Sequence, residues 1–343
     1  MEINLSILIV GAGSIGSRHL ANLQTLTAGP FAVCDPDSEA IDSLQLKPDI
    51  FAFRDFPDAL RSFNPDVVVL CTPPHLHVIQ ALAAVRAGAH VFIEKPLSHS
   101  LEGVDLLVSE AVSRDRLVQV GYNLRFHPGL NNVKEMLDNG KVGKVLCVRS
   151  EFGQYLPDWR PWQDYRDGYS ARRSMGGGII FDSSHEIDYL RWLFGEINHI
   201  YCWAGTISDL EVDVEDTALM VLRFESGVVG EVHLDFIQRA RVRNCKIVGD
   251  IGTLIWDYVD DSVMVYTAST GQWTRSQIQF EPNDMYLEEM KSFLTDLQAR
   301  QWTQESLISA QRVLKIAIEA HESANVGQPV NLSIDIPQPD GAP

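Results

Sequence analysis

The chain has few basic residues and few cysteines for its 343 residues. It carries 28 Lys and Arg against 46 Asp and Glu, a formal net charge of −18 at pH 7. Repulsion from this charge opposes a non-specific hold on nucleic acid or an anionic membrane, so we expect neither partner. The five cysteines, at positions 34, 71, 147, 202 and 245, are widely spaced without a C-x-x-C pair. This spacing argues against a disulfide framework or a zinc knuckle, so we expect a reducing, cytoplasmic setting and no metal.

Long hydrophobic runs and internal repeats are also lacking. The first apolar run, 7–10, is too short to cross a membrane, and no basic cluster precedes it as in an export signal. The one biased stretch is a short Pro/Gly tail at 337–343. With 45% hydrophobic and 22% charged residues, the composition is that of a globular protein, and the length suits two domains.

Short apolar runs alternate with helical patterns up to about Tyr122. We predict strands at 5–10, 31–34, 67–70, 91–93 and 117–120, and helices between them such as 77–87 and 101–113. This alternation implies parallel pairing and an α/β doubly wound sheet buried on both faces. The turns that follow its strands share one edge, where such sheets bind their ligands.

After Tyr122 the pattern changes. Runs such as 145–152, 217–224, 228–236 and 242–248 contain period-two alternation or adjoin a Gly turn, as antiparallel strands do. Two helices, 284–298 and 304–325, are expected to follow. We predict two domains, residues 1–122 and residues 123–343. The second is an α+β domain with an open, mainly antiparallel sheet.

A glycine turn follows the first predicted strand. Gly11-Ala12-Gly13-Ser14-Ile15-Gly16 would let the backbone turn tightly and approach a pyrophosphate at a helix N-terminus. Asp35 ends the second strand, where it would bind the ribose hydroxyls of NAD and repel the 2′-phosphate of NADP. Its alternative role is a turn aspartate before Pro36. Arg18 and His19 are expected at the surface, with contact to a phosphate as the alternative.

Two further turns come to the same edge of the sheet. Thr72-Pro73-Pro74 follows the third predicted strand, with His75 and His77 next in the chain. This turn either faces the cofactor or serves as a rigid connector. Glu94-Lys95-Pro96 ends a buried strand, where charged side chains are costly unless they are paired or used. Lys95 would polarise a substrate hydroxyl, and the alternative is a strand-end ion pair of Glu94.

A glycine-rich loop leads into a helix in the second domain. The segment runs Gly176-Gly177-Gly178 and then Asp182-Ser183-Ser184-His185-Glu186-Ile187-Asp188. We expect Ser183 and Glu186 to form a capping box that places Asp182 just before the helix. His185 and Asp188 are i, i+3 neighbours, so the carboxylate would steady the imidazole of a general base. The alternative is a surface histidine, which would leave the glycines unexplained.

Taken in order, the glycine turn, Thr72-Pro73, Glu94-Lys95-Pro96 and Asp182…His185-x-x-Asp188 resemble the Gfo/Idh/MocA oxidoreductase family over nearly the whole chain. The details of the first helix and of 184–189 resemble its branch in surface-polysaccharide and nucleotide-sugar metabolism. The resemblance implies an N-terminal Rossmann domain, a C-terminal α+β domain that supports homodimers or homotetramers, and a cleft between them. It also implies NAD(P)-dependent interconversion of an alcohol and a ketone on a sugar or polyol.

Carried onto this sequence, the resemblance makes Lys95 a contact of substrate and nicotinamide ribose, Asp182 a substrate-positioning group, and His185 the proton acceptor. It also implies a cis Lys95–Pro96 peptide. The family more often has three residues between this Asp and His, whereas here there are two, Ser183 and Ser184. Because His185-x-x-Asp188 stays aligned, the missing residue falls before the helix and leaves His185 in place.

An arginine-rich segment precedes the glycine loop. Residues 158–173 should overhang the cleft, where aromatics stack on sugars and arginines bind carboxylate or phosphate. This composition points to an anionic carbohydrate substrate or, equally, to an arm that contacts another subunit. We expect the substrate-binding residues to be Tyr122, Arg125, Trp162, Arg166, Arg172, Asp182 and His185.

The sequence thus predicts an NAD-dependent dehydrogenase of a sugar, cyclitol or nucleotide-sugar hydroxyl, with NADP the less suited cofactor. The expected cofactor contacts are Gly11, Gly13, Ser14, Ile15, Gly16, Asp35, Thr72, Pro73, His75, His77, Glu94 and Lys95. One alternative is a sugar epimerase or internal redox enzyme that retains its NAD. Another is a non-catalytic dinucleotide-binding sensor, since a fold does not fix a function.

Overall fold

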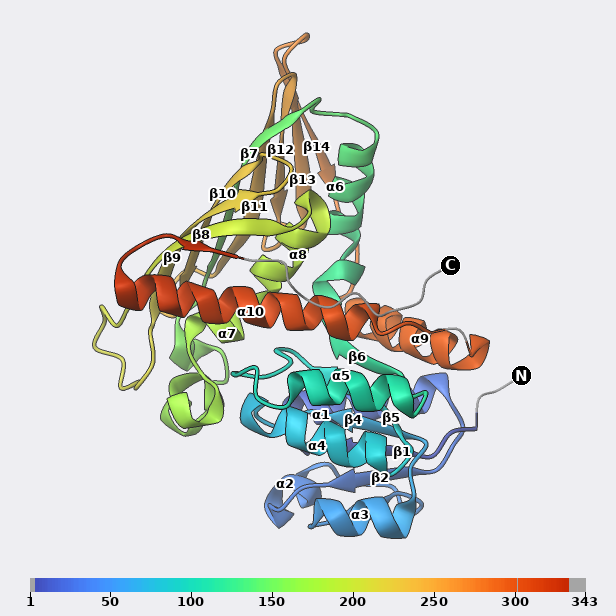
Figure 1. The fold of residues 1–343 in the computed structure, drawn as a ribbon. Helices are drawn as coiled ribbons and strands as arrows, with labels where there is room; N and C mark the ends of the chain where they lie inside the picture. The colour runs from blue at the N-terminus through green and yellow to red at the C-terminus, as the bar shows by residue number, and fades with distance from the viewer. Residues whose placement is uncertain (1–3, 301, 333–343) are drawn as a thin grey trace.

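The computed structural model describes residues 4–300 and 302–332, so the Pro/Gly tail lies outside the described residues. The chain forms two sheets, and the long helix α10 (Glu305–Val326) runs between them (Figure 1). Among the described residues no helix has both the length and the apolar character needed to span a bilayer.

The first sheet is parallel throughout, as predicted. Its strands are β1 (Ile7–Val10), β2 (Phe31–Cys34), β3 (Phe51–Phe53), β4 (Val67–Leu70), β5 (His90–Glu94) and β6 (Val118–Gly121). They lie in the order β3-β2-β1-β4-β5-β6, so the winding direction reverses between β1 and β4. A doubly wound sheet opens its ligand crevice at this point, outside the carboxyl ends of the strands. Strand β3 is short and largely exposed, so no buried apolar run predicted it.

Alternate residues of these strands face two separate helix layers. The helices of this half are α1 (Ser14–Leu26), α2 (Ser38–Ser43), α3 (Phe56–Phe63), α4 (Pro74–Arg86) and α5 (Val104–Ser113). Helices α3, α4 and α5 pack on the side of Leu8, while α1 packs on the side of Ile9. The second layer is completed from the far end of the chain by α9 (Asp284–Ala299), which buries Met290, Phe293 and Leu294 there. Burying each such side chain contributes about 1.5–3 kcal/mol, so α9 is firmly attached to the first sheet.

The second sheet is mixed and mainly antiparallel, as predicted. Its strands are β7 (Val145–Gly153), β8 (Ile197–Gly205), β9 (Thr217–Phe224), β10 (Val229–Asp235), β11 (Val242–Gly249), β12 (Gly252–Asp257), β13 (Ser262–Thr267), β14 (Gln272–Gln277) and β15 (Val330–Asn331). The central β7 and β10 run parallel, and the other neighbours are antiparallel. The remaining helices are α6 (Pro128–Asp138), α7 (Ile179–Asp182) and α8 (Ser184–Phe194), with 3-10 turns at η1 (Asn123–Phe126), η2 (Leu156–Asp158), η3 (Tyr165–Asp167), η4 (Tyr169–Ala171) and η5 (Arg173–Met175).

The two faces of this sheet differ. Helices α6, α8 and α10 pack against one face. On the other face β8 and β9 leave Tyr201, Trp203, Leu219 and Val221 exposed, and these side chains form cross-strand pairs, Trp203 with Leu219 and Tyr201 with Val221. The predicted open sheet therefore presents an apolar surface.

Candidate active site

The glycine turn has the backbone geometry that a dinucleotide requires. Gly11 has φ +100°, and a Cβ there would lie 2.7 Å from the Cys71 carbonyl oxygen. A Cβ on Gly16 would overlap the Gly11 carbonyl, so this glycine lets α1 pack on β1. At Gly13 a Cβ would meet nothing within 4 Å, and no side chain caps the start of α1. The first N–H groups of α1 therefore face a cavity lined by Gly13, Ser14 and Ile15.

The Asp35 carboxylate lies against this turn. Its Oδ2 accepts a hydrogen bond from the Ala12 backbone N–H at 2.7 Å, and its Oδ1 accepts one from Asp37 N–H at 2.9 Å. Asp35, directly after β2, thus has the turn role considered for it, whereas its contact with the ribose of NAD stays a prediction.

The turn after β4 contributes to the cavity through Thr72, Pro73 and Pro74. The two histidines that follow do not line it. His77 is buried, and its ring nitrogens lie 2.8 Å from the Pro96 carbonyl oxygen and 2.7 Å from that of Thr72. His75 Nδ1 lies 3.2 Å from the Met175 carbonyl oxygen. His77 therefore links the turn that contains Thr72 to the turn that contains Pro96 through hydrogen bonds to their backbone carbonyls.

Lys95 reaches from the end of β5 into the second half of the chain. Its Nζ donates to the Asp182 backbone carbonyl at 2.7 Å and to Asp182 Oδ1 at 3.1 Å. The Lys95–Pro96 peptide is cis, as the resemblance implied. Burial disfavours the charged ammonium, but the neighbouring Tyr169 and Asp182 outweigh it and raise the pKa of Lys95 above its usual value. Lys95 is therefore a cation at neutral pH.

Asp182 is buried, and both oxygens of its carboxylate accept hydrogen bonds. Besides Lys95, the Tyr169 hydroxyl donates to Oδ1 at 2.8 Å and the Ser170 hydroxyl donates to Oδ2 at 2.5 Å. Burial alone would raise the pKa of this carboxyl, but Lys95 and the two hydroxyls hold it below its usual value. Asp182 therefore stays ionised beside Lys95.

His185 lies in the first turn of α8, as predicted, with 8% of its surface exposed. Its Nδ1 has no hydrogen-bond partner, and its ring packs edge-on against Tyr122 at 5.7 Å between centroids. Burial lowers the pKa of His185 well below its usual value, and the charges of Lys95 and Arg243 lower it further. The imidazole is therefore neutral at neutral pH.

Two expectations about α8 were wrong. Asp188 does not steady His185, because both its oxygens accept from Arg125, at 2.6 and 2.8 Å. Ser183 is the N-cap residue, but its side chain makes no capping bond, and Glu186 instead pairs with Arg243 at 2.8 Å. In both cases an arginine distant in the chain binds the carboxylate more strongly than the local partner does.

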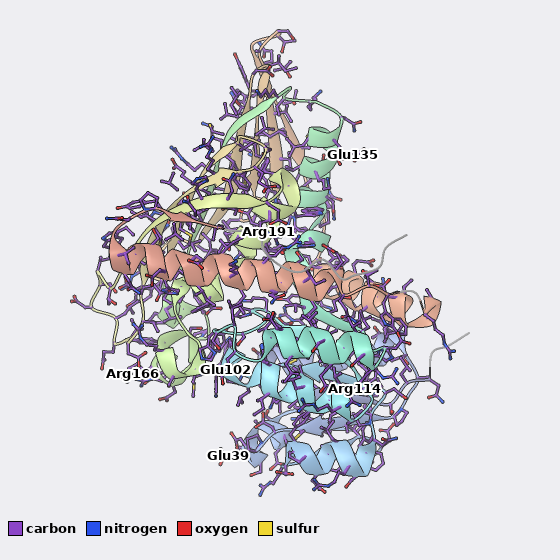
Figure 2. The ribbon with its side chains drawn as sticks, in the orientation of Figure 1. Glu39, Glu102, Arg114, Glu135, Arg166 and Arg191 are labelled. Atoms are coloured by element: carbon purple, nitrogen blue, oxygen red, sulfur yellow. The ribbon has the colours of Figure 1, made fainter. Side chains whose placement is uncertain are left out.

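The arginine-rich segment contributes aromatics and one arginine to the cavity. Its lining residues there are Trp159, Arg160, Trp162, Gln163 and Tyr169. Arg166 lies at the outer edge of the segment (Figure 2), where it pairs with Asp164 at 2.5 Å and Glu211 at 3.1 Å. Arg172 Nε donates to the Arg166 carbonyl at 2.7 Å. The structure therefore brings Trp162 to the cavity but leaves Arg166 and Arg172 outside it.

The contribution of α9 to the cavity and the burial of His19 in α1 were not predicted. Tyr286 of α9 lines the cavity, and the Arg18 guanidinium lies 4.5 Å from the centroid of its ring. His19, expected at the surface, is buried with its Nε2 2.5 Å from Glu94 Oε1. No local pattern could have indicated these contacts, because Tyr286 comes from about 270 residues away.

The cavity has a volume of about 730 Å³ and extends from the glycine turn to Lys95 and Asp182. It adjoins no metal centre, since no group of three or more His, Cys, Asp or Glu within residues 4–300 and 302–332 has metal-ligand geometry. The arrangement is thus a glycine turn with an uncapped helix start, beside a charged Lys–Asp pair and a neutral histidine.

Comparisons with known proteins agree with this geometry. Residues 5–122 match the family model described as an oxidoreductase family with an NAD-binding Rossmann fold. Residues 130–255 match the model of the GFO/IDH/MocA C-terminal domain.

Relatives of known name span most of the chain. Myo-inositol 2-dehydrogenase of Thermotoga maritima is 29% identical over 305 residues, which cover 85% of this chain and 87% of that protein. Levoglucosan dehydrogenase of Pseudarthrobacter phenanthrenivorans is 28% identical over 293 residues, 74% of each chain. The WlbA dehydrogenase of Bordetella pertussis, solved with NADH and UDP-GlcNAcA, has the same fold. It superposes with a TM-score of 0.82 at 22% identity, over 97% of this chain and 100% of that one.

Proposed function

The chain belongs to the GFO/IDH/MocA oxidoreductase family, as its motifs predicted, and we propose that it oxidises a secondary hydroxyl of a carbohydrate with NAD. The substrate class is a sugar, cyclitol or nucleotide sugar, and hydride passes between its hydroxyl-bearing carbon and the nicotinamide. The observation that carries the proposal is the Lys95–Asp182 contact at the floor of the cavity that the glycine turn opens.

The residues at the glycine turn fit NAD. Gly13 leaves open space, the first N–H groups of α1 are uncapped, and Gly11, Gly16 and Asp35 shape the turn behind them. We propose that these groups hold the cofactor, together with Thr72, Pro73 and Lys95. When bound, NAD supplies the hydride acceptor. The Asp35 carboxylate would favour NAD over NADP because it repels a 2′-phosphate.

Charge states support roles for Lys95 and Asp182, which line the cavity, and for His185, which does not line it but lies close enough to Lys95 for that charge to lower its pKa. Because Lys95 is held as a cation, it cannot remove a proton, but it stabilises negative charge that develops on a substrate oxygen. Because His185 is neutral, it can accept the hydroxyl proton. Asp182 stays ionised and orients Lys95 and the substrate. We propose Lys95, His185 and Asp182 as the catalytic residues, with Tyr122 and Arg125 beside them.

The decisive experiment follows absorbance at 340 nm with NAD and, separately, NADP over inositols, free sugars, sugar acids and UDP- or CMP-sugars. Turnover with one class supports the proposal and fixes the cofactor and the substrate. Protein that binds NADH but stays silent on every substrate contradicts it. NAD that survives gel filtration would then favour an enzyme that recycles its cofactor, and its loss would favour a sensor.

We further propose that the substrate carries a carboxylate or phosphate group that Arg160 binds. Arg160 lines the cavity and lies 5.5 Å from the centroid of the Tyr169 ring, whose hydroxyl contacts Asp182. No ion-pair partner of Arg160 occurs among the described residues, whereas Arg166 is neutralised by Asp164 and Glu211. In so acidic a chain, an unneutralised arginine beside Trp159 and Trp162 suits an anionic sugar.

The kinetic signature of this role is selective. Arg160→Gln should raise KM for an anionic substrate about tenfold or more and leave a neutral sugar unaffected, because one charge-assisted contact is lost. Arg86→Gln, which alters a surface ion pair with Glu110, is the control. Equal use of neutral and anionic sugars by both variants would refute the anionic substrate and leave the dehydrogenase intact.

We also propose that the open sheet face binds a second copy of the chain in a homodimer or homotetramer. Support comes from the exposed Tyr201, Trp203, Leu219 and Val221, which form one apolar surface on β8 and β9. Val221→Glu should shift the mass measured by light scattering toward the monomer, while Val259→Glu, in the turn after β12, should not. A monomeric native protein would contradict this interface.

Finally, we propose a cytoplasmic protein with a domain boundary at 122/123 and no membrane or nucleic-acid partner. The five free cysteines and the charge of −18 support this setting. Cell fractionation that places the protein in the soluble cytoplasmic fraction would support it, and recovery from a membrane or nucleic-acid fraction would contradict it.

A further inference from the structure

Glu215 contacts the segment just before Asp182. It comes just before β9 and is 8% exposed. Its backbone carbonyl accepts from Ile179 N–H at 3.2 Å, and its side-chain Oε1 accepts from Ile180 N–H at 3.1 Å. One residue thus binds two consecutive N–H groups at the start of α7.

The glycine loop makes this approach possible. Gly178 has φ +109°, and a Cβ there would overlap the Glu215 carboxylate. A Cβ on Gly177 would overlap the Tyr169 carbonyl. Gly177 and Gly178 therefore allow the loop to pack closely between the Tyr169 carbonyl on one side and the Glu215 carboxylate on the other, and we call this arrangement the clamp.

The clamp is transmitted directly to Asp182. Helix α7 is a single turn from Ile179 to Asp182, closed by a bond from Asp182 N–H to the Gly178 carbonyl at 3.0 Å. A displacement at Ile180 would therefore move Asp182, which contacts Lys95 through both its backbone and its side chain. We propose that Glu215 is a positioning residue that fixes Asp182 against Lys95 by holding the first turn of α7 through its carboxylate.

The surroundings of Glu215 make this hold sensitive to pH. The Nε2 atom of His321, in α10, lies 3.7 Å from Glu215 Oε1 and has no hydrogen-bond partner. The charge of Asp216 raises the pKa of Glu215, and that of Arg173 lowers it. The charge of Glu215 in turn raises the pKa of Cys202, which lies in β8. Burial raises the pKa of Glu215 to about 7, against the Ile180 N–H bond and Arg173, which favour the charged form. An ionised carboxylate accepts the Ile180 N–H more strongly, so the hold weakens as Glu215 takes up a proton.

Hydrogen exchange tests the hold without any substrate. In Glu215→Ala, amides of peptides spanning 178–187 should exchange about tenfold faster or more, because the charge-assisted bond to Ile180 N–H is lost. Native exchange there, corrected for its intrinsic rate, should quicken from about pH 8 to about pH 6, and Glu215→Gln should abolish this dependence. Glu225→Gln, in the exposed turn between β9 and β10, is the control. Unchanged protection in Glu215→Ala overturns the proposal.

The catalytic consequence rests on the proposed function and has its own readout. With the substrate identified by the panel, Glu215→Gln should lose the acid limb near neutral pH, and Glu215→Ala should lower kcat about tenfold or more. NADH affinity, measured by fluorescence, should stay unchanged because the glycine turn is untouched.

If Glu215→Ala fails to fold, Gly178→Ala displaces the same loop. Gly88→Ala is its matched control, because Gly88 also has a positive φ, +96°, but lies in open space. An acid limb that persists in Glu215→Gln overturns the pH-sensitive hold. Lost protection without a loss of kcat overturns the catalytic role alone.

Discussion

Lys95 and Asp182 meet across the two halves of the chain through both a backbone carbonyl, at 2.7 Å, and a carboxylate oxygen, at 3.1 Å. The first contact depends on where the backbone of α7 lies, and the second on the rotamer of Asp182. Because Lys95 is fixed by a strand end and Asp182 by a clamped turn, their geometry is set before any substrate arrives. Such preorganisation is what stabilisation of a developing charge requires.

Replacement of Lys95 by alanine should lower kcat about 10²–10³-fold, as loss of one preorganised donor does in other enzymes. NADH affinity, measured by fluorescence titration, should change far less. Lys134→Ala, which removes a surface lysine paired with Asp138, is the control. Equal losses of kcat and NADH affinity would make Lys95 a cofactor ligand alone.

His185→Gln should lower kcat about 10²–10⁴-fold, the usual contribution of a general base. Since the pKa of His185 lies well below its usual value, loss of activity through its protonation belongs to pH values well below neutrality. The pH profile of kcat/KM separates this limb from one that vanishes in Glu215→Gln. His199→Gln on β8 is the control, and a His185→Gln enzyme with native kcat would refute the role.

Asp35→Asn should raise the NADPH/NADH affinity ratio about tenfold or more, because the negative charge that repels a 2′-phosphate is removed. The asparagine can still accept the Ala12 N–H bond, so the turn should persist. Fluorescence titration with both dinucleotides measures the ratio. Asp37→Asn, which alters the cap of α2, is the matched control, and an unchanged ratio in Asp35→Asn would refute this selectivity.

Arg243→Met should destabilise the fold by about 3–5 kcal/mol, because Glu186 would be left as a buried carboxylate without its partner. Arg114→Met, which breaks a surface pair with Glu110, should cost far less, because solvent screens that pair. Thermal denaturation compares the two variants. Similar midpoints for both would show that Glu186 is accommodated without Arg243.

Glu215 should also govern the pH dependence of stability. Its pKa in the folded chain, about 7, lies above the ordinary value of 4.5, so folding favours the protonated carboxyl. The stabilisation this provides is complete below about pH 4.5 and is lost as the pH rises through 7. The melting temperature of the native protein relative to Glu215→Gln should therefore fall as the pH rises from about 4.5 to about 7, between the pKa values of the unfolded and folded states, and then level off. A constant difference would contradict the shifted pKa.

Elements built from continuous local signals were predictable from sequence. Strands β2, β4 and β9 have the predicted bounds, because their apolar runs end abruptly at polar or turn residues. The glycine turn and Glu94-Lys95-Pro96 were located for the same reason. The parallel pairing of the first sheet followed from the alternation of strands and helices.

Contacts between distant residues were not predictable. A capping box at Ser183 and Glu186 and a pair of His185 with Asp188 are the best local arrangements, yet Arg243 and Arg125 bind those carboxylates instead. Spacing cannot reveal such competitors, because they are 57 and 63 residues away. The clamp at Glu215 was hidden likewise, since its partner Ile180 is 35 residues earlier.

The packing of α9 on the first sheet has a consequence for biosynthesis. Met290, Phe293 and Leu294 fill the core beside β1 and β4, so a nascent chain of only 122 residues leaves that layer incomplete, covered by α1 but not by α9. Its apolar face stays open on the ribosome until some 170 further residues have emerged. The half of the protein that is made first is thus completed nearly last, and until then it is a natural client for chaperones that bind exposed apolar surface.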